Sequence, residues 1–349
     1  MTNLVKHLKG TQPRYESLSG KGYSEDTIYF TNETNDALPL DYGRIYLGDT
    51  LVGMPSVWGG IPSYESSPLT FVTKSGSTVS LSPNPGWNPE NPISLEYSLD
   101  GGGTWDTYML GVAIAIPANG TLQFRGDNET FSQSGIDNTY YGFSITGEAQ
   151  VEGNIMSLLD KSMTLDSVPS YAFTHLFYNC TDLIGISNLR LPAMHLGVHC
   201  YSSMFRGCVK IERPAELPAM VLETFCYYRM YEGCVSLKST PKLHSLDLYA
   251  LCYGSMFSGC TSLATVSELP AIKIAQFCYN SMFDGCSSLK VYSESGEGHG
   301  KLWRIPSAGP GTGYTLQANM FKGTEGDYSS TETIDLSTMN VFYTQNAPI

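Results

Sequence analysis

The sequence predicts a multi-domain, β-rich protein that ends in a solenoid of stacked repeats. Three observations predict it: a 26-residue repeat in the C-terminal half, seven strand-like runs before it, and a distinct N-terminal segment followed by the Gly-, Pro- and Ser-rich residues 54–67. Charged residues make up only 15% of the chain, while Gly and Tyr are plentiful, which favours strands and turns. We expect three parts: a small β-rich segment (1–60), a β-sandwich (68–153) and the solenoid (154–349).

The solenoid is predicted by four 26-residue units that align without gaps. Six columns are identical in all four: the opening Leu, a Cys-Tyr pair, a Met and a Gly-Cys pair. A unit of this length cannot bury its apolar face alone, whereas stacked units share one core. The units begin at Leu191, Leu217, Leu243 and Leu269.

Within each unit, the apolar positions predict a short strand and then a helical segment. The first, fourth and sixth positions are apolar and suit an extended segment with a bend. In the second unit, Cys226, Met230 and Cys234 follow at a spacing of four residues, which is typical of one helix face. We therefore expect a helix from about Cys226 to Gly233, where glycine ends it.

The nine cysteines all lie in this region, eight of them in two columns and Cys180 in a leading unit. Two cysteines eight residues apart on a helix are separated by about 12 Å, which is too far for a disulfide. We expect small buried thiols and a reducing compartment. His195 and His199 lie near Cys200, but further ligands at a workable spacing are missing, so no metal site is expected.

An identical tyrosine follows the first cysteine of every unit. On a helix this position is rotated about 100° from the cysteine face. The tyrosines then form either an exposed aromatic ladder for sugars or protein, or a structural edge of the core; we prefer the structural interpretation, because an identical residue suits stacking better than specificity. The candidate binding residues are Tyr201, Tyr227, Tyr253 and Tyr279, with Trp303 in a 12-residue insertion near the end of the array.

The pattern C-Y-x-x-M-F-x-G-C-x-S-L, with L-P-A opening a unit, resembles the BspA-type leucine-rich repeats of bacterial surface proteins. The resemblance spans about residues 167–294. It implies a right-handed leucine-rich-repeat solenoid with a strand on one face, and a role in adhesion or binding rather than catalysis. Tyr171 to Leu183 and Asn319 to Gly323 are degenerate units that we expect to cap the array.

The middle of the chain predicts a sandwich of short strands. Asp100 to Gly103 lies between two alternating runs and predicts a hairpin, whereas residues 85–92 predict a loop. Arg125-Gly126-Asp127 ends a run and is interpreted as a turn rather than a receptor signal. The seven runs are residues 69–74, 77–83, 93–100, 104–110, 112–118, 121–127 and 141–147.

The N-terminal segment contains two strand candidates joined by a polar loop. The stretch from Tyr15, through S-E-D-T-I-Y-F, to I-Y-L-G-D resembles the attachment segment of head and tail fibre proteins of phages that infect gut Bacteroidales. This resemblance implies a homo-oligomeric virion protein, commonly a trimer, that docks on other virion proteins through its N-terminus. The candidate attachment residues are Ile45, Tyr46, Leu47, Gly48 and Asp49.

Charge and motifs narrow the functional classes. The net charge of −13 opposes binding to nucleic acid or an anionic membrane. No catalytic motif, cofactor motif, export signal or membrane span is apparent. We expect a phage virion fibre or decoration protein, assembled in the host cytoplasm, that presents its repeats to a host surface protein or glycan. The alternatives are a bacterial surface or secreted adhesin and, third, a glycan-active enzyme.

Overall fold

The computed structural model describes residues 67–134, 137–296, 299, 318–328 and 341–344, together with the backbone of five strands outside these ranges. The chain divides into two compact units, Met1–Ser63 and Tyr64–Ile349. The protein is β-rich, with several sheets and almost no helix among the described residues.

The first unit contains a four-stranded sheet in the order β1-β2-β3-β4. Strand β1 runs parallel to β2, and the other pairs are antiparallel. The first expected strand is confirmed as β2, whereas the run expected as the second strand contains both β3 and β4. Ile45, Tyr46 and Leu47 lie in β3, and Gly48 and Asp49 lie outside the described residues. The strands are β1 (Lys6–His7), β2 (Ile28–Thr31), β3 (Arg44–Leu47) and β4 (Thr50–Gly53).

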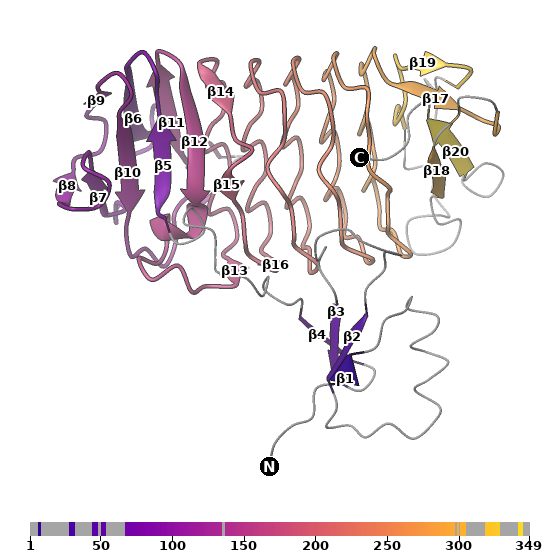
Figure 1. Ribbon diagram of the computed structural model, residues 1–349, viewed down its shortest axis with the longest axis horizontal. Coiled ribbons are helices and arrows are strands. Elements are labelled where there is room, and N and C mark those ends of the chain that lie inside the picture. Colours follow the sequence, from indigo (N-terminus) through magenta and orange to yellow (C-terminus); the bar gives the residue numbers. More distant parts are fainter. Residues whose placement is uncertain are drawn as a thin grey trace. The chain divides into compact units, whose positions relative to one another are not determined.

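The second unit begins with two sheets, and each of the seven expected runs contains one strand (Figure 1). One sheet has the order β14-β12-β5-β10-β7-β8, and the other has the order β11-β6-β9. Their strands are β5 (Leu69–Val72), β6 (Ser77–Pro83), β7 (Leu95–Ser98), β8 (Asp106–Tyr108), β9 (Ile114–Ile116), β10 (Thr121–Arg125), β11 (Tyr141–Thr146), β12 (Ala149–Asn154) and β14 (Leu183–Gly185).

The two sheets pack face to face, as in a β-sandwich. The ring of Phe143 in β11 lies 4.9 Å from the ring of Phe71 in β5 and 5.5 Å from that of Phe124 in β10. Burial alternates along β6 and β11, because successive side chains of a strand point to opposite faces. This region therefore matches the sandwich-like arrangement expected from the sequence.

The expected hairpin between β7 and β8 is confirmed. The Asp100 carboxylate accepts hydrogen bonds from the Ser98 hydroxyl and from the backbone N–H and hydroxyl of Thr104. These bonds lower the pKa of Asp100 to about 2, the Thr104 backbone bond contributing most. Gly101 and Gly102 have positive φ angles of 73° and 94°, which only glycine adopts without strain.

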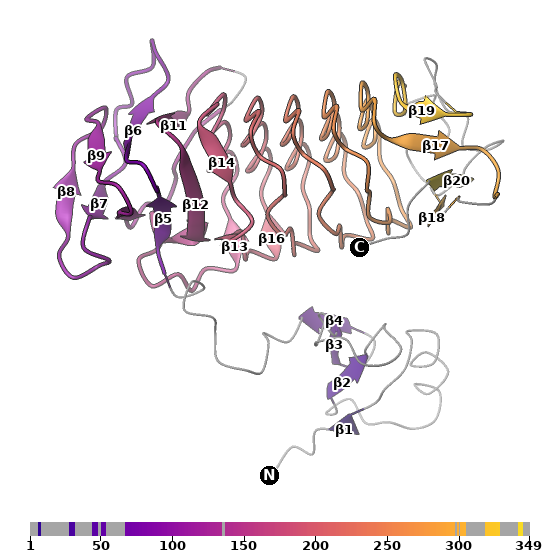
Figure 2. The same cartoon turned by 45° about the horizontal axis from the view of Figure 1, so that its top comes forward.

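No break separates the sandwich from the repeats, in contrast to the expected boundary at residue 153/154. Strand β12 pairs in parallel with β14 and with β15 (Leu189–Arg190), which belong to the first coils. The buried side chains form one continuous cluster from Leu69 to Phe342. In Figure 2 the repeat units follow β12 one after another. The open edge of the sheet at β12 provides unpaired backbone groups with which the first unit pairs.

The helix expected in each unit is wrong. Among the described residues the only helix is a short 3-10 element, η1 (Ile155–Leu158), outside the repeats. The segment from Phe225 to Cys234 is instead a run of turns. The Tyr228 N–H donates to the Phe225 carbonyl three residues earlier at 3.1 Å, and the Tyr227 N–H donates to the Cys252 carbonyl of the next unit at 3.1 Å.

These two kinds of hydrogen bond alternate along the run and satisfy its backbone N–H groups. A left-handed residue recurs every fourth position, with φ angles of 60° at Phe225, 56° at Arg229 and 73° at Gly233. In this part of the run, the two residues after a left-handed position point inward and the next two point outward. The four-residue spacing of the buried side chains therefore comes from four-residue turns and not from a helix.

A glycine recurs at the same position of each unit, and the backbone conformation there explains why. Its φ angles lie between 73° and 77°, in the left-handed region. A Cβ added at Gly259 would lie 3.7 Å from the Cα of Gly233, and one at Gly323 would lie 3.3 Å from the Cα of Gly285. The column consists of Gly207, Gly233, Gly259, Gly285 and Gly323.

Both degenerate units stack on the array as expected. The Phe173 N–H donates to the Cys200 carbonyl at 2.9 Å, and the Phe283 N–H donates to the Met320 carbonyl at 2.9 Å. Phe342 closes the core beyond the last turn, with its ring 4.9 Å from that of Phe321. The final sheet has the order β18-β20-β17-β19, formed by β17 (Lys290–Tyr292), β18 (Lys301–Arg304), β19 (Glu325–Gly326) and β20 (Val341–Thr344).

The strand part of each unit is shorter than a regular strand. Strand β13 (Ser167–Val168) pairs in parallel with β16 (His195–Leu196), and later units are joined by single parallel bridges, such as that between Asp247 and Lys273. One expected element of the unit, an extended segment after the opening Leu, is therefore present only as these brief contacts.

Candidate functional site

The cysteine columns are part of the core, as expected. All nine cysteines lie in the described part of the chain, and each is buried as a thiol rather than joined in a disulfide. In the second column the thiol donates to a carbonyl of the preceding unit; the Cys234 Sγ lies 3.1 Å from the Phe205 oxygen. Burial raises the pKa of Cys226 and Cys234 to about 12, which suppresses thiolate chemistry.

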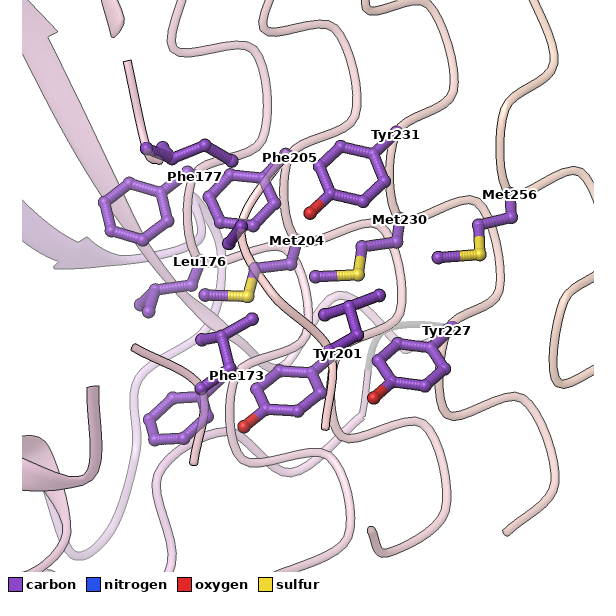
Figure 3. Close-up of a cluster of buried hydrophobic side chains, with 14 of the residues drawn as sticks. Phe173, Leu176, Phe177, Tyr201, Met204, Phe205, Tyr227, Met230, Tyr231 and Met256 are labelled. Atoms are coloured by element: carbon purple, nitrogen blue, oxygen red, sulfur yellow. The ribbon is translucent and has the colours of Figure 1, made fainter. Parts of the chain in front are cut away.

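The four candidate binding tyrosines are core residues, so the structural interpretation preferred from the sequence is confirmed and the exposed ladder is wrong. Tyr201, Tyr227, Tyr253 and Tyr279 are between 0 and 2% exposed. Their rings stack between adjacent units, with centroids 5.9 Å apart for Tyr201 and Tyr227 (Figure 3). The reason is the turn geometry, which points the residue after the cysteine inward as well.

A second buried ladder was not anticipated from the sequence. The rings of Phe205 and Tyr231 stack at 5.5 Å (Figure 3). Those of Tyr231 and Phe257 stack at 5.7 Å. Two inward positions in each turn explain it, since the methionine column and this aromatic column occupy adjacent positions. Each four-residue turn therefore buries two side chains, whereas the expected helix face buried one side chain in every four residues.

The other sequence candidates are dispersed. Trp303 lies in β18, opposite Phe342 of β20, and its side chain lies outside the described residues. The exposed His195 ring is 4.0 Å from Asp166, whereas His199 is buried among aromatic rings. Arg125 ends β10 and is held by Glu96 at 2.8 Å, consistent with a structural strand end.

The outward positions of the turn runs form a surface that we call the turn face. Its residues differ between units whose core columns are identical. The turn face comprises Tyr171, His175 and Tyr178; His199, Ser202, Ser203 and Arg206; Phe225, Tyr228, Arg229 and Glu232; Leu251, Gly254, Ser255 and Ser258; and Phe277, Asn280, Ser281 and Asp284. Of these residues, His199, Ser202, Ser203 and Gly254 are buried.

The second and third units provide an internal comparison. The Arg229 N–H donates to the Gly254 carbonyl at 3.0 Å, and the equivalent Ser255 N–H donates to the Asn280 carbonyl at 2.8 Å. The φ angles of Arg229 and Ser255 are 56° and 52°. The same backbone therefore forms with a small residue, and the large side chains of the second unit are not needed to build the turn.

These large side chains form a cluster with residues of the preceding units. The Glu232 carboxylate lies between two arginines: its Oε2 is 3.0 Å from Arg206 Nε and 3.4 Å from Arg229 Nε. The Arg229 guanidinium lies 4.8 Å from the ring centroid of Tyr228, and that of Arg206 lies 5.7 Å from the ring of Tyr178. We call Tyr178, Arg206, Tyr228, Arg229 and Glu232 the aromatic–arginine cluster.

Two histidines adjoin this cluster. His199 stacks between Tyr171 and Phe225, with centroid distances of 5.2 and 4.3 Å. Burial lowers the pKa of His199 to about 4; burial and then the nearby charge of Arg206 lower that of His175 to about 4. Both rings are therefore neutral at pH 7, and the formal charge of the cluster is +1, from two arginines and one glutamate.

The cluster offers guanidinium and phenolic hydroxyl groups, which can donate hydrogen bonds to a ligand. No group of three or more His, Cys, Asp or Glu side chains that could hold a metal ion occurs in the described ranges. The described residues also contain no helix long and apolar enough to cross a membrane.

The sequence did contain a signal for the cluster, since its positions vary between units whose core columns are identical.

No known protein family, curated protein or solved structure matches this chain.

Proposed function

We propose that this protein is a non-enzymatic phage virion protein, a head or tail fibre or a decoration protein. Its N-terminal unit docks on other virion proteins, and its repeats form a leucine-rich-repeat solenoid that presents the turn face to a host surface protein or glycan. The observation that carries the proposal is the aromatic–arginine cluster, a group of large side chains on a regular scaffold that does not need them.

The repeat geometry supports a display role. Backbone hydrogen bonds join each turn run to the next, from Phe173 through to Met320. Such an array holds outward side chains at fixed spacing, since each unit is positioned by its neighbours. The nine buried thiols suit assembly in a reducing cytoplasm, and a trimer joined through the N-terminal unit is the proposed assembly.

The alternative function is a bacterial surface or secreted adhesin. It is favoured by the resemblance of the C-Y-x-x-M-F-x-G-C pattern to bacterial surface repeats. Both functions use the turn face for binding, but only the virion protein needs the first unit for incorporation into particles.

A truncation separates the two functions. A chain that starts at Ser67 removes the first compact unit and leaves β5 and the continuous core intact. We expect it to retain the thermal unfolding transition of the repeats and to be absent from purified phage particles, measured by quantitative mass spectrometry beside the full-length protein. Equal incorporation of the truncated chain would contradict docking through the N-terminal unit.

A further inference from the structure

We propose that the aromatic–arginine cluster binds the carboxylate of an acidic glycan, and that Arg229 recognises this carboxylate. The inference rests on the proposed function, because it assigns a ligand class to the face that the fibre would present. It requires a donor group that the protein leaves available, a fixed orientation of that group, and neighbours suited to a sugar.

Arg229 supplies the available donor. Its Nε faces Glu232 at 3.4 Å, whereas its two Nη atoms have no protein partner among the described residues. Arg206 differs, because its Nε and Nη2 both contact the same carboxylate, at 3.0 and 3.4 Å. The two Nη groups of a guanidinium form a planar fork that matches a carboxylate in bidentate geometry.

The cluster also fixes this fork. The Tyr228 ring lies against the Arg229 guanidinium at 4.8 Å, and Glu232 Oε2 forms an ion pair with Nε at 3.4 Å without a hydrogen bond. A preoriented guanidinium loses less rotamer freedom when it binds a ligand. The Arg229 side chain is 37% exposed, so a ligand can reach it.

Charge favours an anionic ligand at this position. The single carboxylate of Glu232 cannot neutralise both arginines, and His175 and His199 are neutral at pH 7. The remaining positive charge is local, on a chain whose net charge is −13. An acidic polymer would therefore be repelled by most of the surface and oriented toward the cluster.

The groups beside Arg229 suit a sugar. Phe225, Tyr228 and Tyr178 are partly exposed aromatic residues, and the two tyrosines also offer phenolic hydroxyls. Apolar ring edges next to hydroxyl donors and acceptors complement a sugar, which has apolar C–H groups and several hydroxyls. Arg229 occupies a left-handed position at which the other three units have serine, so the backbone there does not require a large side chain.

The test is binding of the purified full-length protein to oligosaccharides of matched length, measured by calorimetry. The probes end in glucuronate, in N-acetylneuraminate, in glucose, or in a phosphorylated glucose; an acidic peptide is the fifth probe. We expect a carboxylated saccharide to bind at least about tenfold more tightly than the neutral one, and R229S to remove that advantage.

K273S is the matched control. Lys273 is an exposed cation paired with Asp247 at 3.1 Å outside the turn face, so its removal changes the net charge equally. We expect K273S to bind like the unaltered protein, and R229S to unfold at the same temperature. The proposal is overturned if neither carboxylated saccharide binds, if both variants weaken binding equally, or if the phosphorylated sugar or acidic peptide binds as tightly as the carboxylated one. Because no virion is involved, this failure is distinguishable from failure to incorporate the protein into particles.

Discussion

The inward and outward sides of the turn runs follow opposite rules. Inward positions repeat the same residues in unit after unit, such as Met230 and Met256, whereas outward positions differ, as Arg229 and Ser255 do. The backbone is the same in both units, with matching hydrogen bonds and φ angles at equivalent positions. The difference indicates that stacking constrains the inner side chains, while the outer side chains are available for recognition.

The largest effect should come from the inner side. Met256 is completely buried between stacked units (Figure 3). We expect M256A to reduce the free energy of unfolding by about 2–5 kcal/mol, because it removes buried contacts and leaves a cavity. Chemical denaturation would measure this. V221A is the control, since Val221 is 48% exposed, and should change stability by less than about 0.5 kcal/mol. Equal effects of the two variants would contradict the assigned inner side.

A pH-dependent effect should come from the histidine at the border of the two sides. The pKa of His199 is lowered to about 4 from 6.5, so between these pH values the unfolded chain binds more protons than the folded chain. Stability should therefore fall as the pH drops from about 6.5 to about 4, by on the order of 2 kcal/mol for this residue.

H199F tests this linkage with a residue that the chain already uses at the same position, Phe225 in the second unit and Phe277 in the fourth. It should retain ring stacking and lessen the loss of stability in acid, as measured by unfolding at pH 7 and pH 4.5. An unchanged pH dependence would show that His199 titrates normally in the folded protein.

A smaller effect is expected for the glycine column. Gly259 has a φ angle of 74°, and an added Cβ would lie 3.7 Å from the Cα of Gly233, which is an ordinary contact. The cost of G259A should therefore be mainly left-handed strain, about 1–2 kcal/mol. Thermal unfolding would measure it. A loss as large as that of M256A would indicate that space, rather than backbone conformation, requires glycine.

The sequence predicted these regions unevenly, for physical reasons. In the sandwich, alternation along runs such as Ser77 to Pro83 indicated strands, because a two-residue period is typical of an extended backbone with one buried face. In the repeats, the spacing of Cys226, Met230 and Cys234 was compatible with a helix or with four-residue turns. The hydrogen bonds between units, such as that from Tyr227 to Cys252, and the left-handed φ angles at every fourth residue distinguish the two.

The candidate site was missed for the same reason. A helix would have rotated Tyr227 away from the cysteine face, so the tyrosine column, rather than Tyr228 and Arg229, was considered as a binding surface. One ion pair of Glu232 joins it to Arg206, 26 positions earlier, and the register of stacking is needed to see it. From the sequence, only the differences between units at the outward positions indicated which side chains the fold does not require.

The smallest change in stability is expected for the triple variant Y228S/R229S/E232S. This variant also tests most directly whether the outward side chains serve binding rather than folding. It replaces the large outward side chains of the second unit with the serines of equivalent positions: Ser202 for Tyr228, Ser203 for Arg229 and Ser258 for Glu232. Its unfolding free energy and its binding to a carboxylated saccharide would be measured on the same preparation. We expect the free energy of unfolding to change by no more than about 1 kcal/mol and carboxylate-dependent binding to be lost. A large loss of stability, or binding that remains unchanged, would contradict this expectation.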